Sequence, residues 1–63
     1  MTRTFEISIE AHNGTEHFDT TKRFATVQAM RAWIREFAAD WWKDAEYFAF
    51  CRDTEEFFHG RAN

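Results

Sequence analysis

Residues 4–24 read TFEISIEAHNGTEHFDTTKRF, and this stretch decides the fold. Apolar and polar side chains alternate from Thr4 to Ala11, which is the period of a strand that buries one face. Asn13-Gly14 follows, and this dipeptide favours the tight turn of a β-hairpin because both turn positions need a positive φ. We therefore predict two antiparallel strands, Thr4–Ala11 and Thr15–Phe24.

The turn also predicts how the two strands are aligned. A two-residue turn at Asn13-Gly14 sets the register of the residues on either side of it. The paired residues are then Glu10 and His17, Ile9 and Phe18, and Ser8 and Asp19. This register places Ile9 and Phe18 together on the core face, so the alternation of the two strands agrees.

A helix is predicted to follow the hairpin. Thr26 can cap it, and its apolar residues recur every three or four positions, which defines one face of a helix. We expect this helix to end near Asp44. Its apolar stripe is Val27, Met30, Ile34, Phe37, Ala38 and Trp41.

The C-terminal third leaves several readings open. Residues 45–52 are β-prone and apolar on both faces, which predicts a third strand. Residues 53–60 have the form of a capping box followed by a glycine, which favours a short helix, but their alternation also fits a fourth strand. A restart of the main helix after Asp44 is a further alternative. The expected fold class is α+β, with one long helix packed on an antiparallel sheet of three or four strands.

Length and composition restrict the class of protein. A chain of 63 residues predicts one small domain, 1–63. Cys51 is the only cysteine, so no disulfide forms within the chain, and a reducing compartment is expected. No stretch has the apolar length of a membrane span or the pattern of a signal peptide. We expect a cytoplasmic protein that does not bind membranes.

The aromatic residues suggest an interaction surface. Nine of the twelve fall between Trp33 and Phe58, and seven acids against two bases lie between Glu36 and Glu56. One small core cannot readily bury so many rings, so some should face a partner with a basic surface or a second copy of the chain. The residues predicted to bind a protein are Trp33, Asp40, Trp42, Asp44, Glu46, Tyr47, Glu55, Glu56 and Phe58.

The sequence offers three other kinds of candidate site. Arg23, Arg31 and Arg35 with exposed aromatic rings form an alternative nucleic-acid surface, which the net charge of −3 disfavours. A metal at Glu10, His12 and His17 is disfavoured because a hairpin tip is short and no fourth ligand is evident. Cys51 with His59 lacks a third group to orient a nucleophile and base. We predict no catalytic residue, no metal and no cofactor.

The chain resembles the very short accessory proteins that bacteriophages and other mobile elements encode to modify host machinery. The resemblance rests on the length, on the lack of targeting and catalytic motifs and on the hairpin-plus-helix plan, and no functional residue is transferred from it. It implies an inhibitor or modulator of a host protein that handles nucleic acids or takes part in defence. For a phage-encoded protein, the location would be the host cytoplasm.

Overall fold

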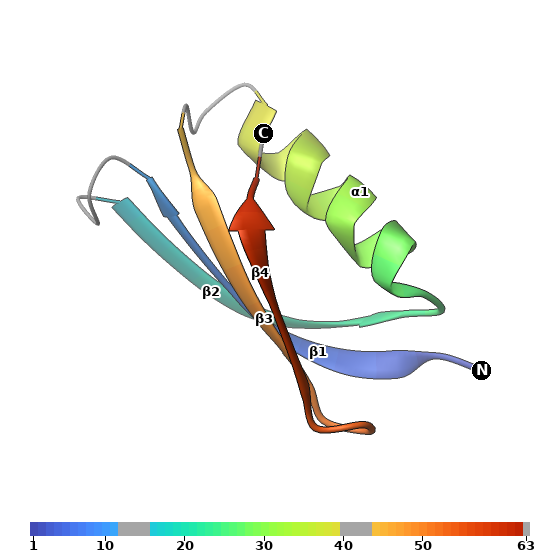
Figure 1. Cartoon of the computed structure of the whole chain (residues 1–63). Coiled ribbons are helices and arrows are strands. Elements are labelled where there is room, and N and C mark those ends of the chain that lie inside the picture. Colours follow the sequence, from blue (N-terminus) through green and yellow to red (C-terminus); the bar gives the residue numbers. More distant parts are fainter. Residues whose placement is uncertain (12–15, 40–43, 63) are drawn as a thin grey trace.

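The computed structural model describes residues 1–11, 16–39 and 44–62. It contains four strands and one helix: β1 (Arg3–Ala11), β2 (Glu16–Phe24), α1 (Val27–Ala39), β3 (Glu46–Cys51) and β4 (Glu56–Arg61). The strands form one antiparallel sheet in the order β2-β1-β3-β4, and α1 lies against one of its faces (Figure 1). The predicted α+β fold is confirmed, and residues 56–61 form a fourth strand.

The hairpin register is also as predicted. Glu10 lies opposite His17, Ile9 opposite Phe18 and Ser8 opposite Asp19. Burial alternates along β1, because Phe5, Ile7 and Ile9 point into the core while the residues between them do not. The predicted turn at Asn13-Gly14 lies outside the described residues.

Thr26 caps α1 as expected from its hydroxyl group. Its Oγ1 accepts a hydrogen bond from the amide of Ala29 at 3.0 Å, which satisfies one of the free amides of the first turn. Met30, Ile34 and Ala38 are buried along one side of the helix. The helix is described as far as Ala39, and the residues between it and Asp44, near which it was predicted to end, lie outside the described part of the chain. Asp44 itself has a φ of 55°, which is not helical. Trp41, the last residue of the predicted stripe, lies outside the described residues.

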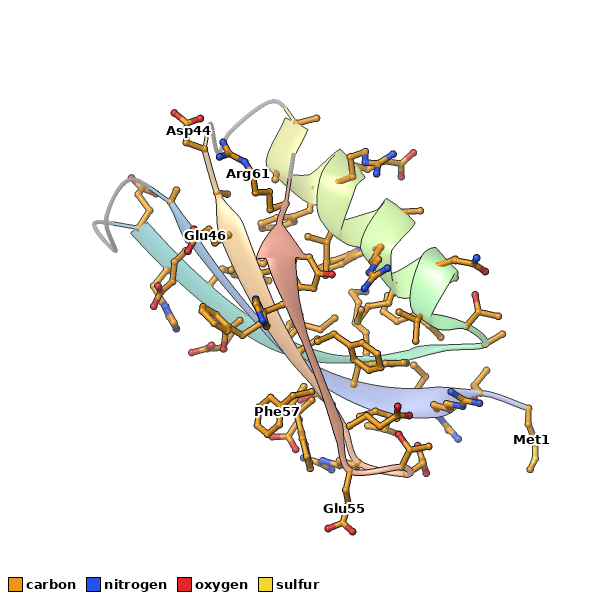
Figure 2. All side chains as sticks on the ribbon, in the orientation of Figure 1. Met1, Asp44, Glu46, Glu55, Phe57 and Arg61 are labelled. Carbon is orange, nitrogen blue, oxygen red and sulfur yellow. The ribbon has the colours of Figure 1, made fainter. Side chains whose placement is uncertain are left out.

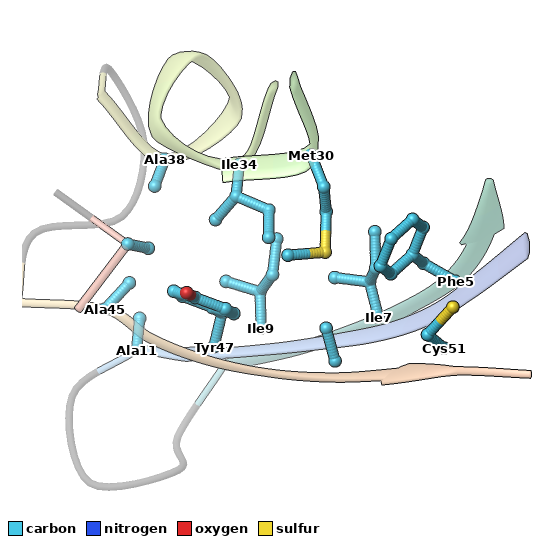
Figure 3. Close-up of a cluster of buried hydrophobic side chains, with 12 residues drawn as sticks. Phe5, Ile7, Ile9, Ala11, Met30, Ile34, Ala38, Ala45, Tyr47 and Cys51 are labelled. Atoms are coloured by element: carbon cyan, nitrogen blue, oxygen red, sulfur yellow. The ribbon is translucent and has the colours of Figure 1, made fainter. Parts of the chain in front are cut away.

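The core lies between α1 and the two central strands (Figure 3). Met30 and Ile34 of the helix are fully buried together with Phe5, Ile7 and Ile9 of β1. From β3 the core takes the side chains that point toward the helix, which are Tyr47, Ala49 and Cys51. The two intervening phenylalanines of β3 therefore point to the opposite face of the sheet.

The turn between β3 and β4 explains why residues 53–60 do not form a short helix. Asp53 Oδ2 accepts a hydrogen bond from the amide of Thr4 at 2.7 Å, so this carboxylate holds the turn against β1 instead of capping a helix. The amide of Glu55 donates to the carbonyl of Cys51 at 2.8 Å, and Glu55 has a φ of 57°. This left-handed residue reverses the chain, and β4 then pairs with β3 along its whole length.

The left-handed φ of Glu55 leads to a stability prediction. Residues with a side chain lose roughly 1–2 kcal/mol in this conformation, and glycine does not. We expect Glu55→Gly to raise the free energy of unfolding by about 0.5–1 kcal/mol, measured by urea denaturation. The matched control is Glu56→Gly, which places glycine in a strand and should lower the free energy of unfolding by about 0.5–1 kcal/mol. Equal effects at both positions would contradict the assignment of the turn.

Candidate interaction site

The sheet has one face that α1 does not cover, called here the open face. Strand register places its side chains in rows that run across all four strands. One row is His17, Glu10, Glu46 and Arg61; the next is Asp19, Ser8, Phe48 and His59; the third is Thr21, Glu6, Phe50 and Phe57. The open face is therefore polar over β1 and β2 and aromatic over β3 and β4.

The aromatic part of the open face consists of Phe48, Phe50, Phe57 and His59, which we call the aromatic patch. Phe57 is 74% exposed and Phe48 is 44% exposed, whereas Phe50 is half-buried. The rings of Phe50 and Phe57 are 4.9 Å apart, and those of Phe48 and His59 are stacked at 6.2 Å. Figure 2 shows Phe57 on the side of the sheet away from α1. These rings form two neighbouring pairs across two adjacent strands.

Charged residues border the patch at both ends. Arg61 pairs with Asp44 at 3.0 Å beyond one end of β3 (Figure 2). Arg52 pairs with Glu6 at 2.8 Å near the other end. Both arginines are thus matched by a carboxylate of the same chain.

The remaining carboxylates around the patch are not matched in this way. Within the described part of the chain, no cation pairs with Glu46 or Glu55. Glu56 lies opposite the buried Cys51 and so belongs to the covered face. Glu46 also lies directly opposite Glu10 on the neighbouring strand. Like charges in this arrangement repel each other, and a cation supplied from outside would relieve the repulsion.

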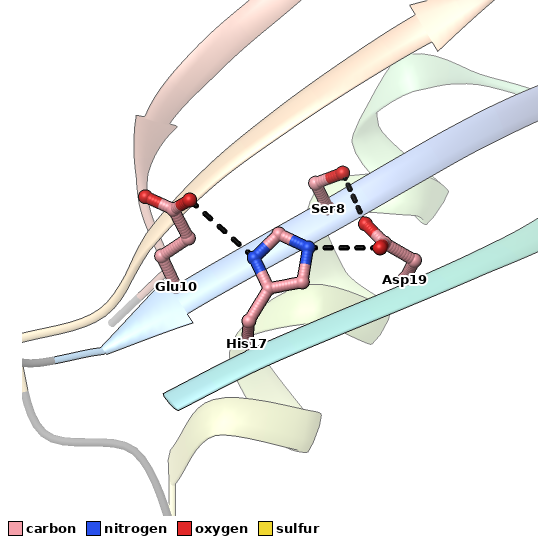
Figure 4. A network of polar contacts seen from close by, with 4 residues as sticks. All are labelled: Ser8, Glu10, His17 and Asp19. Carbon is pink, nitrogen blue, oxygen red and sulfur yellow. Dashed lines mark hydrogen bonds and ion pairs between the residues drawn. The ribbon is translucent and has the colours of Figure 1, made fainter. Parts of the chain in front are cut away.

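A network of polar contacts occupies the other half of the open face (Figure 4). The Ser8 hydroxyl donates to Asp19 Oδ1 at 2.5 Å, and His17 Nε2 lies 2.8 Å from Asp19 Oδ2. His17 Nδ1 lies 3.4 Å from Glu10 Oε1. The hydrogen bond to Asp19, helped by the charges of Asp19 and Glu10, raises the pKa of His17 above its ordinary value of 6.5. The hydrogen bond from Ser8, followed by that from His17, lowers the pKa of Asp19 below 3.8.

These two shifts predict how stability depends on pH. The contribution of His17 is fully present below pH 6.5 and is lost as the pH rises through its raised pKa in the folded state. The contribution of Asp19 is present above pH 3.8 and is lost as the pH falls through its lowered pKa. An NMR titration should therefore give His17 a pKa above 6.5, and Asp19→Asn should bring it down. An unchanged His17 titration in Asp19→Asn would show that Asp19 is not the cause.

The residues predicted to bind a protein do not form one surface. Tyr47 is only 4% exposed, and its hydroxyl accepts a hydrogen bond from Arg31 Nε at 2.9 Å beneath the helix. Phe58 is half-buried and packs on Phe5, with ring centroids 6.3 Å apart. Trp33 is half-buried on α1, with its ring centroid 5.4 Å from that of Phe37.

The acids of that set fall at separate ends of the sheet. Asp44 and Glu46 lie near the end of β4, whereas Glu55 and Glu56 lie at the β3–β4 turn (Figure 2). Asp40 and Trp42 lie outside the described residues. The role of the set in protein binding stays a prediction, but its aromatic members differ from those that the structure exposes. Because both faces of the third strand are apolar, the sequence left open whether Phe48 and Phe50 turn outward, and Phe57 and His59 were not in the predicted binding set.

The alternative set of arginines is also divided between faces. Arg23 belongs to β2 and lies on the open face, in the same alternation as His17, Asp19 and Thr21. Arg31 belongs to α1 and contacts Tyr47 on the covered side of the sheet, and Arg35 is one turn further along the same helix. No common surface therefore joins these three residues.

The other two kinds of site can now be placed. Cys51 is 1% exposed and faces the helix, whereas His59 lies on the open face, so the two do not meet. Burial raises the pKa of the Cys51 thiol, but hydrogen bonds from Thr54 and from the backbone of Asp53 outweigh it, so the pKa lies below its ordinary value. Among residues 1–11, 16–39 and 44–62, no cluster of three or more His, Cys, Asp or Glu side chains could hold a metal ion. His12, one of the three weighed ligands, lies outside the described residues.

Comparison with protein-family models, curated proteins and solved structures finds no match for this chain. No helix in the described part of the chain is long and apolar enough to cross a membrane. The case for a function therefore depends on the open face and its aromatic patch.

Proposed function

We propose that this chain is a non-enzymatic binding protein that docks a partner protein on its open face. The observation that carries the proposal is the exposure of Phe57 and Phe48 beside Phe50 and His59. Large aromatic side chains contribute much of the binding energy in protein interfaces when a partner removes them from water. A cluster of exposed rings bordered by charges is typical of such a docking surface.

The partner is proposed to present basic residues around an apolar centre. Within the described residues, Glu46 and Glu55 form no ion pair, because Arg61, which lies opposite Glu46, pairs with Asp44 instead. Both carboxylates are therefore available to an outside arginine or lysine. Opposite charges at the rim of an interface speed association and select among partners. The match between an apolar centre and an acidic rim therefore favours a protein with a basic groove or patch.

The finer form of the proposal is an inhibitor of a host protein. Together with the resemblance to phage accessory proteins, the neighbouring carboxylates of Glu10 and Glu46 support it. Two negative groups on adjacent strands can occupy positions at which a groove normally holds phosphates. The inhibited protein would then be one that handles nucleic acids, including components of bacterial defence.

A small nucleic-acid binder is the second candidate, and one observation favours it. Aromatic rings on the open face of an antiparallel sheet can stack on the bases of a single strand. The charges count against it, since Arg52 and Arg61 beside the patch already pair with Glu6 and Asp44. A strand of phosphates would have to compete with both carboxylates.

Two binding measurements separate these candidates. The immobilised chain is exposed to bacterial lysate at low and at high salt, and a gel-shift titration is run with single- and double-stranded probes. We expect specific retention of a basic protein that weakens as salt rises, and no gel shift. Retention of no specific protein at low salt would contradict the proposal, and a shift with single-stranded probes would favour the second candidate.

A further inference from the structure

The outer edge of β4 is open, and its sequence carries little that would prevent another strand from pairing there. β4 ends the sheet, and Figure 1 shows it crossing in front of β3. Natural edge strands are usually protected by lysine, proline, a bulge or inward-pointing charges. β4 pairs with β3 in unbroken register, and its central residues, 57–60, are Phe-Phe-His-Gly. The other edge strand, β2, carries Asp19, Lys22 and Arg23 in its middle and final parts.

The backbone groups available at this edge can be assigned. The amide of Ala62 donates to the carbonyl of Ala45 at 2.8 Å, so Ala62 directs its backbone polar groups toward the neighbouring strand. Hydrogen-bonding direction alternates along an antiparallel strand. Phe57, His59 and Arg61 therefore direct their amide and carbonyl groups away from β3, toward the open edge.

We propose that β4 pairs antiparallel with β4 of a second copy of this chain. The two copies would be related by a two-fold axis perpendicular to the sheet, which is the symmetry that brings identical edges together. This axis keeps the open faces of both copies on one side. Odd-numbered residues therefore lie opposite odd-numbered residues across the new edge, and even-numbered residues lie opposite even-numbered ones.

One such register matches the side chains on both sides. It places Phe57 opposite the partner's His59, and Phe58 opposite the partner's Phe58. Moving the register by two residues would instead place the two His59 side chains opposite each other and Phe58 opposite the partner's Gly60, which removes the pair of phenylalanines.

The aromatic pairing favours a second copy over an unrelated strand. Aromatic pairs across neighbouring strands stabilise a sheet. Pairing also joins the two aromatic patches into one surface, because Phe57 and His59 lie on the open face in both copies. A chain this short buries a smaller share of its surface alone than a larger domain does, and pairing would enlarge that share.

The first test changes only the backbone. The chain is short enough to synthesise, and N-methylation of the His59 amide removes an outward donor but keeps every side chain. The matched control is N-methylation of Thr21 on β2. The amide of Arg52 donates to the carbonyl of Thr4, so the even-numbered residues of β1 direct their backbone polar groups toward β3 and not toward β2. Thr21 lies opposite Glu6, one of these even-numbered residues, so its amide points to the open edge of β2. Sedimentation is measured from roughly 1 µM to 1 mM, the range expected for small, weak interfaces.

We expect the unmodified chain and the Thr21 control to dimerise with rising concentration. The His59 variant should dissociate about tenfold more readily or worse, because it loses two hydrogen bonds for each dimer. Circular dichroism checks that both methylated chains remain folded. An unmodified chain that stays monomeric throughout, or a folded His59 variant that dimerises as well as the Thr21 control, would overturn the proposal.

The second test fixes the register with surface cysteines, which leaves the core intact. Chains carrying Phe57→Cys are mixed with chains carrying His59→Cys and oxidised at low concentration. In the proposed register these positions face each other about 5.5 Å apart, within reach of a disulfide. Like positions lie about 7–8 Å apart, which is too far for an unstrained bond.

Mass spectrometry should therefore find the mixed disulfide well above the twofold excess that random pairing gives. A product dominated by disulfides between two His59→Cys chains would overturn the register, and random proportions would overturn edge pairing. This inference goes beyond the proposed function. N-methylation of His59 leaves the aromatic patch unchanged, so loss of the dimer and loss of partner binding can be told apart.

Discussion

Phe5→Ala should leave most of the chain unfolded at 25 °C. Phe5 has no exposed surface, and its ring lies 6.0 Å from that of Phe24 and 6.3 Å from that of Phe58, measured between centroids. Replacing a buried phenylalanine by alanine costs about 3–5 kcal/mol through lost burial and the cavity left behind. A core of this size rarely supplies more than about 3–5 kcal/mol in total. Urea denaturation followed by circular dichroism measures the free energy of unfolding of Phe5→Ala and of the unchanged chain.

The matched control makes the same substitution on the open face. Phe57 is 74% exposed, so Phe57→Ala removes little buried surface. We expect its free energy of unfolding to stay within about 0.5 kcal/mol of the unchanged chain. If Phe57→Ala were as destabilising as Phe5→Ala, Phe57 would have to be buried, and the open face would not exist as described.

The hairpin and the helix start could be predicted because their signals are local and agree with their surroundings. The alternation of Thr4–Ala11 matches a sheet with one covered face, and β1 has that environment. Thr26 caps the helix with its own hydroxyl, so no distant residue was needed to foresee it. The hairpin register could be predicted as well, because the two-residue turn sets it and the core faces of both strands then coincide.

The sequence left the last segment open between a strand and a short helix because its local signal favours a helix cap. Asp53 begins a sequence typical of a helix cap, yet its carboxylate accepts a hydrogen bond from Thr4, which is 49 positions earlier in the chain. That contact exists only when β1 and β3 are already paired. A tertiary interaction therefore overrides the local preference.

The face of β3 that turns outward was also undetermined by sequence. Both of its faces are apolar, so alternation alone gives two solutions. The hydrogen bond from Arg31 to Tyr47 suggests why one is chosen, since the phenol on the covered face finds a donor on α1. Phe48 and Phe50 need no such partner and take the open face. This choice moves the exposed rings away from Tyr47 and Phe58, which the sequence had suggested, and onto Phe48 and Phe57.

Phe57→Ala should weaken binding of the partner protein by about 30-fold or more. An aromatic residue at the centre of an interface commonly contributes about 2 kcal/mol or more, which corresponds to about that factor in the dissociation constant. Isothermal titration with the captured partner measures the change, and Thr21→Ala, on the same face but outside the patch, should bind normally. Because Phe57→Ala keeps the stability of the fold, its loss of affinity reports on contact with the partner and not on unfolding. If Phe57→Ala bound the partner with unchanged affinity, the aromatic patch would not be part of the interface, even though the chain captures a basic protein.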